Sequence, residues 1–183
     1  MAAVPGMALK RAFGVNGSLR DGVVFVDATT VVYIAGHCVV VRDVGLSHVK
    51  SKKAKDRFIT GTADMAGISS LAISKDKKWM AVAEVARAPK FQEAIAAAGA
   101  INTFPVVTVY SMRRLAMKRS LTSDKAGSRE YVSMSFTWDG KHIAALGGAP
   151  DWQLQLWHIN DAKVVCAIKT ATLTSSAVYQ VSN

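Results

Sequence analysis

The sequence predicts an all-β fold of WD40-type β-propeller blades that is incomplete, with about three blades and the start of a fourth. Three observations predict this fold: apolar runs of strand length, tight-turn signals between the runs, and recurrence of the whole pattern along the chain. The pattern is clearest in residues 131–169, where four such runs follow one another. Four short antiparallel strands in about 40 residues is the period of one propeller blade.

The first run of this stretch, residues 131–137, alternates apolar and hydroxyl side chains. A period of two indicates a half-buried strand. Asp139-Gly140 follows, and a tight hairpin turn needs a positive φ that Gly supplies without a Cβ clash. We therefore predict a structural role in the turn for Asp139 and Gly140, and not a catalytic role for the Asp139 carboxylate. The other predicted strands of this blade cover residues 142–146, 153–157 and 164–168.

The same pattern recurs elsewhere in the chain, which turns a local prediction into an architectural one. The matching segments are 71–82 with 134–145, 106–110 with 153–157, and 178–182 with 131–135, and a weaker copy spans 23–42. Each blade buries its faces against its neighbours, so several copies are needed for a stable body.

These repeats predict the domain organisation. Residues 1–9 are expected to form a flexible N-terminal tail, and residues 10–183 a partial WD-repeat propeller. The predicted blades are blade 1 at about 21–60, blade 2 at about 68–121, blade 3 at about 131–169, and the start of blade 4 at about 175–183. A closed propeller needs roughly 4–8 blades. We therefore expect the start of a longer protein or a piece that another chain completes, and the alternative is a small, self-contained β-sandwich.

The second predicted blade carries an insertion over residues 86–104. Phe91, Ile95 and Ala98 recur there at helical spacing, and Gly99 is placed as a stop. We expect a short helix above a long hairpin. The apolar side of this helix either packs on its own blade or forms a docking face for a partner.

The chain has 183 residues and a formal net charge of +10, so acidic partners are expected. Part of this charge is clustered in two predicted loops. The partner-contact candidates are Lys50, Lys52, Lys53, Lys55, Arg113 and Arg114. The alternative interpretation is that both clusters are solvated loops between strands.

Two cysteines, Cys38 and Cys166, lie in strand-like runs, and we interpret them as reduced core thiols of an intracellular protein. Residues 1–9 do not have the pattern of a secretory signal. The uncharged window 94–112 contains Gly99 and a proline and is too weak for a membrane-spanning helix.

Motifs that carry chemistry are missing from the sequence. There is no phosphate-binding loop, no zinc-protease motif and no nucleophile elbow, so we predict neither an enzyme nor a cofactor, a metal ion or a small-molecule substrate. His142 and His158 fall on neighbouring predicted strands and are able to approach each other. We interpret them as surface histidines at the edge of the blade, in preference to a metal-binding pair.

One polar pair is predicted to have a structural role. In WD-type blades an Asp in the hairpin between the second and third strands often joins a hydrogen-bond network with the Trp of the third strand, because a buried indole N–H needs an acceptor. Asp151 and Trp157 occupy these positions. The His that usually joins this network is missing here, so at most a partial network is expected.

Several segments resemble the N-terminal WD-repeat region of the cilia- and flagella-associated protein 57 family. They are the stretch from Phe13 to Val44, the stretch 57–84 that begins Arg57-Phe58-Ile59-Thr60-Gly61, and the end Val178-Tyr179-Gln180-Val181-Ser182. The resemblance implies a truncated form of a non-catalytic scaffold of the ciliary or flagellar axoneme, in the cytoplasm and its cytoskeleton. It implies inner dynein arm components and doublet microtubules or tubulin as partners within a large complex. The remaining blades and the coiled coil of the family are missing here.

Two other functions remain open at this stage. A basic nucleic-acid-binding or general protein-interaction module is supported by the charge and by Trp79, Trp138, Trp152 and Trp157, although these fall at repeat positions that propellers use for packing. An enzyme would need a convergent set of titratable residues that the sequence does not offer.

Overall fold

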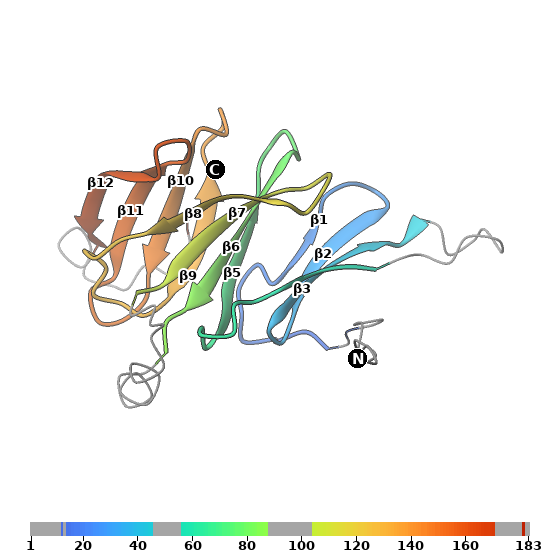
Figure 1. Ribbon diagram of the computed structural model, residues 1–183, viewed down its shortest axis with the longest axis horizontal. Helices are drawn as coiled ribbons and strands as arrows, with labels where there is room; N and C mark the ends of the chain where they lie inside the picture. The colour runs from blue at the N-terminus through green and yellow to red at the C-terminus, as the bar shows by residue number, and fades with distance from the viewer. Residues whose placement is uncertain (1–11, 13, 46–55, 88–103, 171–180, 182–183) are drawn as a thin grey trace, which may run out of the picture.

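The computed structural model describes residues 12, 14–45, 56–87, 104–170 and 181, and the described part is all-β (Figure 1). It contains three four-stranded antiparallel sheets and no α-helix among the described residues. The predicted all-β fold class is therefore confirmed. None of the described segments forms a helix that is long and apolar enough to cross a membrane.

The sheets follow the chain, and we call them sheets A, B and C. Sheet A consists of β1 (Val23–Phe25), β2 (Thr30–Ala35), β3 (Cys38–Asp43) and β4 (Arg57–Thr60). Sheet B consists of β5 (Gly67–Ile73), β6 (Trp79–Val85), β7 (Val106–Ser111) and β8 (Met117–Thr122). Sheet C consists of β9 (Tyr131–Phe136), β10 (His142–Gly147), β11 (Gln153–His158) and β12 (Lys163–Lys169). Each strand pairs with the next in the chain, so every sheet is a simple meander.

Sheet C shows how the alternating pattern becomes a packed layer. Phe136 on β9, Ile143 on β10 and Trp157 on β11 stand opposite one another in a row across the sheet. All three are buried in the core that sheet C shares with sheet B. Because side chains alternate across a strand, the neighbours of these residues point to the other face of the sheet.

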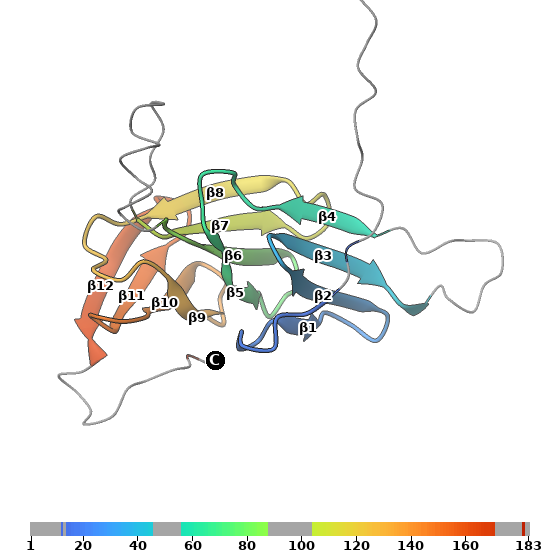
Figure 2. The same ribbon diagram turned by 90° about the horizontal axis from the view of Figure 1, so that it is seen from below.

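The three sheets lie side by side in chain order (Figure 2). Their facing sides form two apolar cores, one between sheets A and B and one between sheets B and C. The first strands of sheets B and C, β5 and β9, also lie next to each other. A third, smaller cluster, which includes Tyr33 and Phe58, covers the outer side of sheet A. Stability therefore depends on packing between sheets and not on any single sheet.

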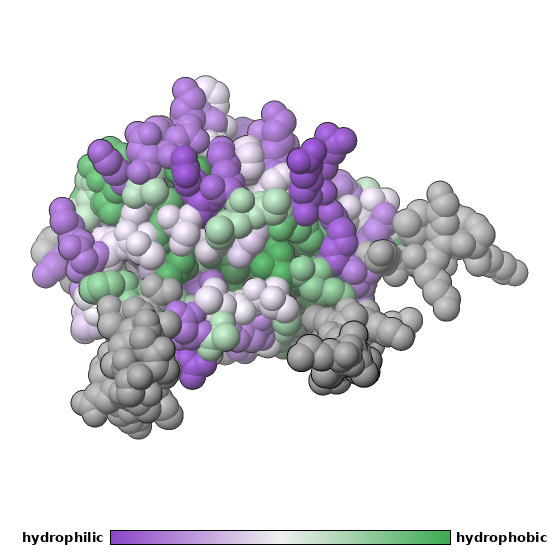
Figure 3. Space-filling model, viewed as in Figure 1, coloured by the Kyte–Doolittle hydropathy of each residue, from purple (hydrophilic) through white to green (hydrophobic). Residues whose placement is uncertain are grey.

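Both ends of this row expose apolar side chains. Val165 and Ile168 on β12 are 59% and 42% exposed, and Phe25 on β1 is 69% exposed. Figure 3 shows hydrophobic surface over the region where Figure 1 places β12. Cys38 on β3 is half-buried, but Cys166 on β12 is exposed. The prediction of a core thiol is therefore wrong for Cys166. β12 is an edge strand of sheet C, and most of its residues are exposed although the run is apolar.

Several predicted features lie outside the described residues. These are the N-terminal tail at 1–9, most of the insertion at 86–104, the basic residues Lys50, Lys52, Lys53 and Lys55, and most of the segment at 175–183.

Candidate functional site

The predicted Asp139-Gly140 turn joins β9 to β10. Gly140 has a φ of +65°. The Asp139 carboxylate accepts hydrogen bonds from the Thr137 hydroxyl at 2.6 Å and from the Lys141 backbone N–H at 3.0 Å. These bonds, the Thr137 hydroxyl first, lower the pKa of Asp139 below its ordinary value. In this structure the carboxylate closes a turn, and its hydrogen bonds favour the ionised form.

The same device closes the first hairpin of the other two sheets. Asp27 accepts from the backbone N–H of Thr29 at 2.8 Å, and Asp76 accepts from the Ser74 hydroxyl at 2.7 Å. The pKa of each carboxyl is lowered, by the Thr29 backbone N–H in Asp27 and by the Ser74 hydroxyl in Asp76. Three sheets thus share one turn chemistry, which supports the inference of a structural repeat.

Asp151 and Trp157 do not form the predicted hydrogen bond. The indole Nε1 of Trp157 is buried and has no hydrogen-bond partner. Asp151 instead accepts from the backbone N–H of Gly127 at 2.7 Å. The predicted partial network is wrong for this pair, because Asp151 is used to hold the connection between β8 and β9.

A different polar pair occupies the core of sheet C. The buried Tyr131 hydroxyl donates to the side-chain carbonyl of Gln155 at 2.9 Å. Burial, and then the negative charge of Asp151, raises the pKa of Tyr131 well above its ordinary value. The neutral phenol is therefore a permanent donor at neutral pH. Sequence reasoning missed this pair, although a Gln in the middle of an apolar strand was a usable signal.

The partner-contact candidates Arg113 and Arg114 lie in the β7–β8 turn and are exposed. The backbone carbonyls of Met112 and Arg113 accept hydrogen bonds from the Arg57 guanidinium, at 3.4 and 3.1 Å. Arg57 of sheet A thus fixes the position of the β7–β8 turn, while the side chains of Arg113 and Arg114 face solvent. This geometry suits a basic contact surface on a rigid support.

A second arginine repeats this arrangement one sheet further along. Arg119 on β8 donates to the backbone carbonyl of Asn160, in the β11–β12 turn, at 3.1 Å. We call these two contacts the inter-sheet arginine links. In each link, an arginine on the fourth strand of one sheet binds the turn after the third strand of the next sheet. Sequence reasoning counted these arginines only as positive charge.

A buried carboxylate connects sheets A and B. Glu84 on β6 is 3% exposed and accepts from the backbone N–H and the hydroxyl of Thr62, at 2.6 and 2.9 Å. His37, in the β2–β3 turn, places Nε2 3.8 Å from the same carboxylate. A buried charge is tolerated when it is hydrogen-bonded in this way. Glu84 therefore ties the β4–β5 connection to sheet B.

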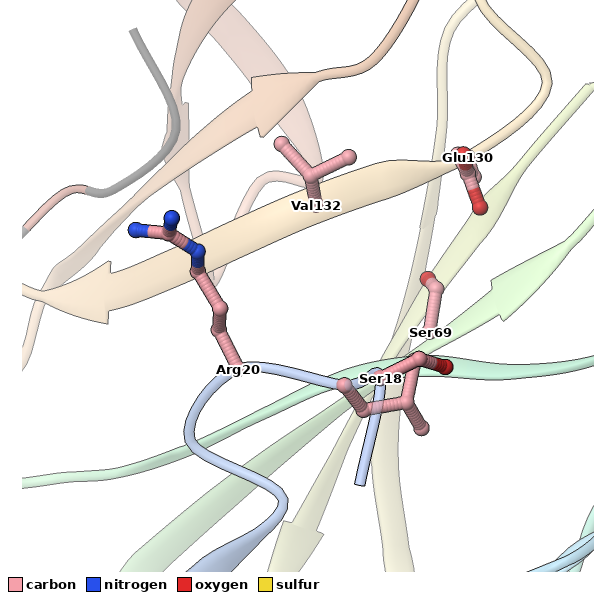
Figure 4. Close-up of a pocket in the computed structure, with 6 residues that line it drawn as sticks. Ser18, Arg20, Ser69, Glu130 and Val132 are labelled. Carbon is pink, nitrogen blue, oxygen red and sulfur yellow. The ribbon is translucent and has the colours of Figure 1, made fainter. Parts of the chain in front are cut away.

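A pocket of about 290 Å³ opens beside the first strands of sheets B and C. Figure 4 shows Arg20 extending toward β9, with Ser69 and Glu130 nearby. The Ser69 hydroxyl is buried without a hydrogen-bond partner, and the Ser18 hydroxyl donates to Asn16. Neither serine is thus paired with the Glu130 carboxylate as an activated nucleophile would be.

The four tryptophans do not share one surface. Trp157 is 1% exposed, and Trp79 is half-buried beneath the Lys118 ammonium, 4.0 Å from its ring centre. Trp138 is 77% exposed, and Trp152 is half-buried. A stacking platform for single-stranded nucleic acid needs aromatic rings in a continuous exposed row. The four tryptophans of this chain do not form such a row.

The comparisons with known proteins give one match that spans the whole chain. No protein-family model matches. This chain is 26% identical to cilia- and flagella-associated protein 57 of Mus musculus over 185 residues, which cover 100% of the chain. The resemblance to that family is supported. A second relative, cilia- and flagella-associated protein 44 of Mus musculus, is 22% identical over 151 residues, or 82% of this chain. The chain spans 13% and 7% of the lengths of these two proteins.

Proposed function

We propose that this chain is a non-catalytic scaffold module of the ciliary or flagellar axoneme. The observation that carries the proposal is that the similarity to cilia- and flagella-associated protein 57 extends over all three sheets and not over one repeat. A second relative is also named for cilia and flagella, and neither name describes an enzyme.

The proposal includes the architecture. Sheets A, B and C are consecutive WD-repeat blades, at about residues 21–60, 68–121 and 131–169, and residues 175–183 begin a fourth. Repetition supports this assignment, because the Asp turn occurs in all three sheets and the arginine link at both junctions. Val181 adds support, since its backbone N–H donates to the Ser133 hydroxyl on β9 at 3.0 Å. Val181 thus lies beside the first strand of sheet C.

The proposed partners are axonemal proteins, with inner dynein arm components and doublet microtubules as the specific candidates. The net charge of +10 and the exposed Arg113 and Arg114 support an acidic partner such as the tubulin tails. In this role the module helps to position inner dynein arms by docking between a microtubule and other scaffold proteins.

Cosedimentation with microtubules tests the proposed contact. We expect binding that weakens as salt rises, because exposed charges are screened within about 10 Å at 0.1 M ionic strength. Charge reversal of Arg113 and Arg114 together should weaken binding, whereas charge reversal of the exposed Lys75 and Lys125 together serves as the matched control. Binding that does not depend on salt would exclude the electrostatic contact.

Localisation tests the broader proposal. A tagged chain expressed in ciliated cells is expected in the axoneme and should remain there after detergent extraction. Recovery of the chain only in the detergent-soluble fraction would contradict a scaffold role, whatever the outcome with microtubules alone.

A further inference from the structure

Two histidines meet on the face of sheet C that points away from sheet B. His142 is the first residue of β10 and stands directly opposite His158, the last residue of β11. Their ring centres are 5.0 Å apart, and the ring planes are inclined by 48°. The next row, Ile143 and Trp157, points into the core between the sheets. The two imidazoles therefore share the opposite face, and both are half-exposed.

The surroundings hold both residues in place. The Nδ1 atom of His158 lies 2.7 Å from a carboxylate oxygen of Asp161. Because a carboxylate only accepts, Nδ1 carries the hydrogen in the neutral imidazole and Nε2 keeps its lone pair. His142 is fixed through its backbone, since its N–H donates to the Thr137 hydroxyl and its carbonyl accepts from the Thr137 N–H.

We propose that His142 and His158 chelate one divalent transition-metal ion, with Cu²⁺ bound most tightly and Zn²⁺ less tightly. Imidazole nitrogen suits both ions, and Cu²⁺ has the higher affinity for a given set of nitrogen ligands. A carboxylate that orients a ligating imidazole through its other nitrogen is the usual support of such histidines. Asp161 thus positions His158 and is not itself a ligand.

Charged residues of both signs surround the histidine pair. Asp139 and Asp161 flank the pair in the two adjoining turns, and Lys141 and Lys163 lie next to His142 and opposite His158. Among the described residues, no group of three or more His, Cys, Asp or Glu side chains is arranged to hold a metal ion. The affinity therefore comes from the two imidazoles, and water completes the coordination.

The test is a titration of the full 183-residue chain with CuCl₂, with glycine as a competing chelator, followed by electron paramagnetic resonance. We expect one Cu²⁺ bound by two imidazole nitrogens. His142→Asn and His158→Asn should each weaken binding by about a hundredfold, since each removes the gain from engaging two ligands at once. The double variant should be little weaker than either single variant, because the chelate is already lost.

Further variants distinguish chelation by the pair from binding at separate single histidines. Asp161→Asn should cost about tenfold in affinity with both imidazole signals retained, as expected for a positioning group. His48→Asn, which removes a histidine outside the pair, should leave the affinity unchanged. ZnCl₂ should raise the unfolding temperature of the wild type and not of the double variant, since a ligand of the folded state stabilises it. Unchanged Cu²⁺ affinity in either single variant, or independent additive losses, would overturn the proposal.

Discussion

The two junctions between the sheets share an outer contact and differ inside. At each junction an arginine of the fourth strand binds a backbone carbonyl in the next sheet, Arg57 between sheets A and B and Arg119 between sheets B and C. The interior of the first junction contains the buried Glu84 carboxylate, whereas the second is built around the ring of Trp157. The repeat thus fixes the outer geometry and leaves the interior free to vary.

Sheet C, at the end of the row of sheets, extends this comparison. Arg57 stands opposite Val41 and Arg119 opposite Val109, each two residues before the end of the third strand. Cys166 stands opposite Leu156, at the corresponding position of sheet C. On β4 and β8 this position is an arginine that binds the next sheet, whereas on β12 it is a cysteine. Whatever packs against sheet C needs a different contact at this point.

The largest expected effect is at the second junction. Trp157→Ala removes a fully buried side chain from the core between sheets B and C, so we expect a loss of about 3–5 kcal/mol in the free energy of unfolding. Urea unfolding followed by circular dichroism measures it. Trp138→Ala is the matched control and should change stability by no more than about 0.5 kcal/mol, because this ring is exposed. Equal effects at the two positions would contradict the proposed core.

The corresponding change at the first junction should cost less. Glu84→Ala removes the buried acceptor of the Thr62 backbone N–H and hydroxyl, for which we expect a loss of about 1–3 kcal/mol. Glu84→Gln keeps one acceptor oxygen and should recover part of this loss. The same urea measurement distinguishes the two variants, and identical stabilities would show that the hydrogen bond to Thr62 contributes little.

The arginine links should contribute least among these packing contacts, and should do so equally. Arg57→Ala and Arg119→Ala are each expected to lower stability by about 0.5–1 kcal/mol, because the contacts are exposed. The two losses should add in the double variant, since the links share no residue. Arg114→Ala serves as the control and should be nearly neutral. A strong effect of only one link would argue against a repeated device.

Local features of the fold were predictable from the sequence. The alternation in residues 131–137 and the Asp139-Gly140 pair act over a few residues, so they predicted a strand and a turn where β9 and its hairpin lie. The recurrence of such runs predicted an all-β chain for the same reason. The exposure of Cys166 was missed because an edge strand and a central strand have similar sequences.

The contacts between sheets were harder to predict. A hydrogen bond was predicted between Asp151 and Trp157, but in the folded protein Asp151 accepts a hydrogen bond from the backbone N–H of Gly127 instead. The spacing of two residues along the chain does not determine which polar groups meet across a junction. Glu84 offered a signal, since a carboxylate within an apolar strand must find donors, but its donor Thr62 precedes sheet B and was not identifiable in advance. His142 and His158 were expected to approach, and only the register showed them directly opposite.

The smallest expected effect concerns the shared turn and its dependence on pH. The pKa of Asp139 is lower in the folded protein than its ordinary value of 3.8, chiefly because the Thr137 hydroxyl binds the carboxylate. The turn therefore stabilises the fold fully above about pH 4, and this contribution is lost as the pH falls through the lowered pKa. The urea midpoints of wild type and Asp139→Asn should differ most near neutral pH and converge in acid. A constant difference between wild type and Asp139→Asn at every pH would contradict the role of the Asp139 charge.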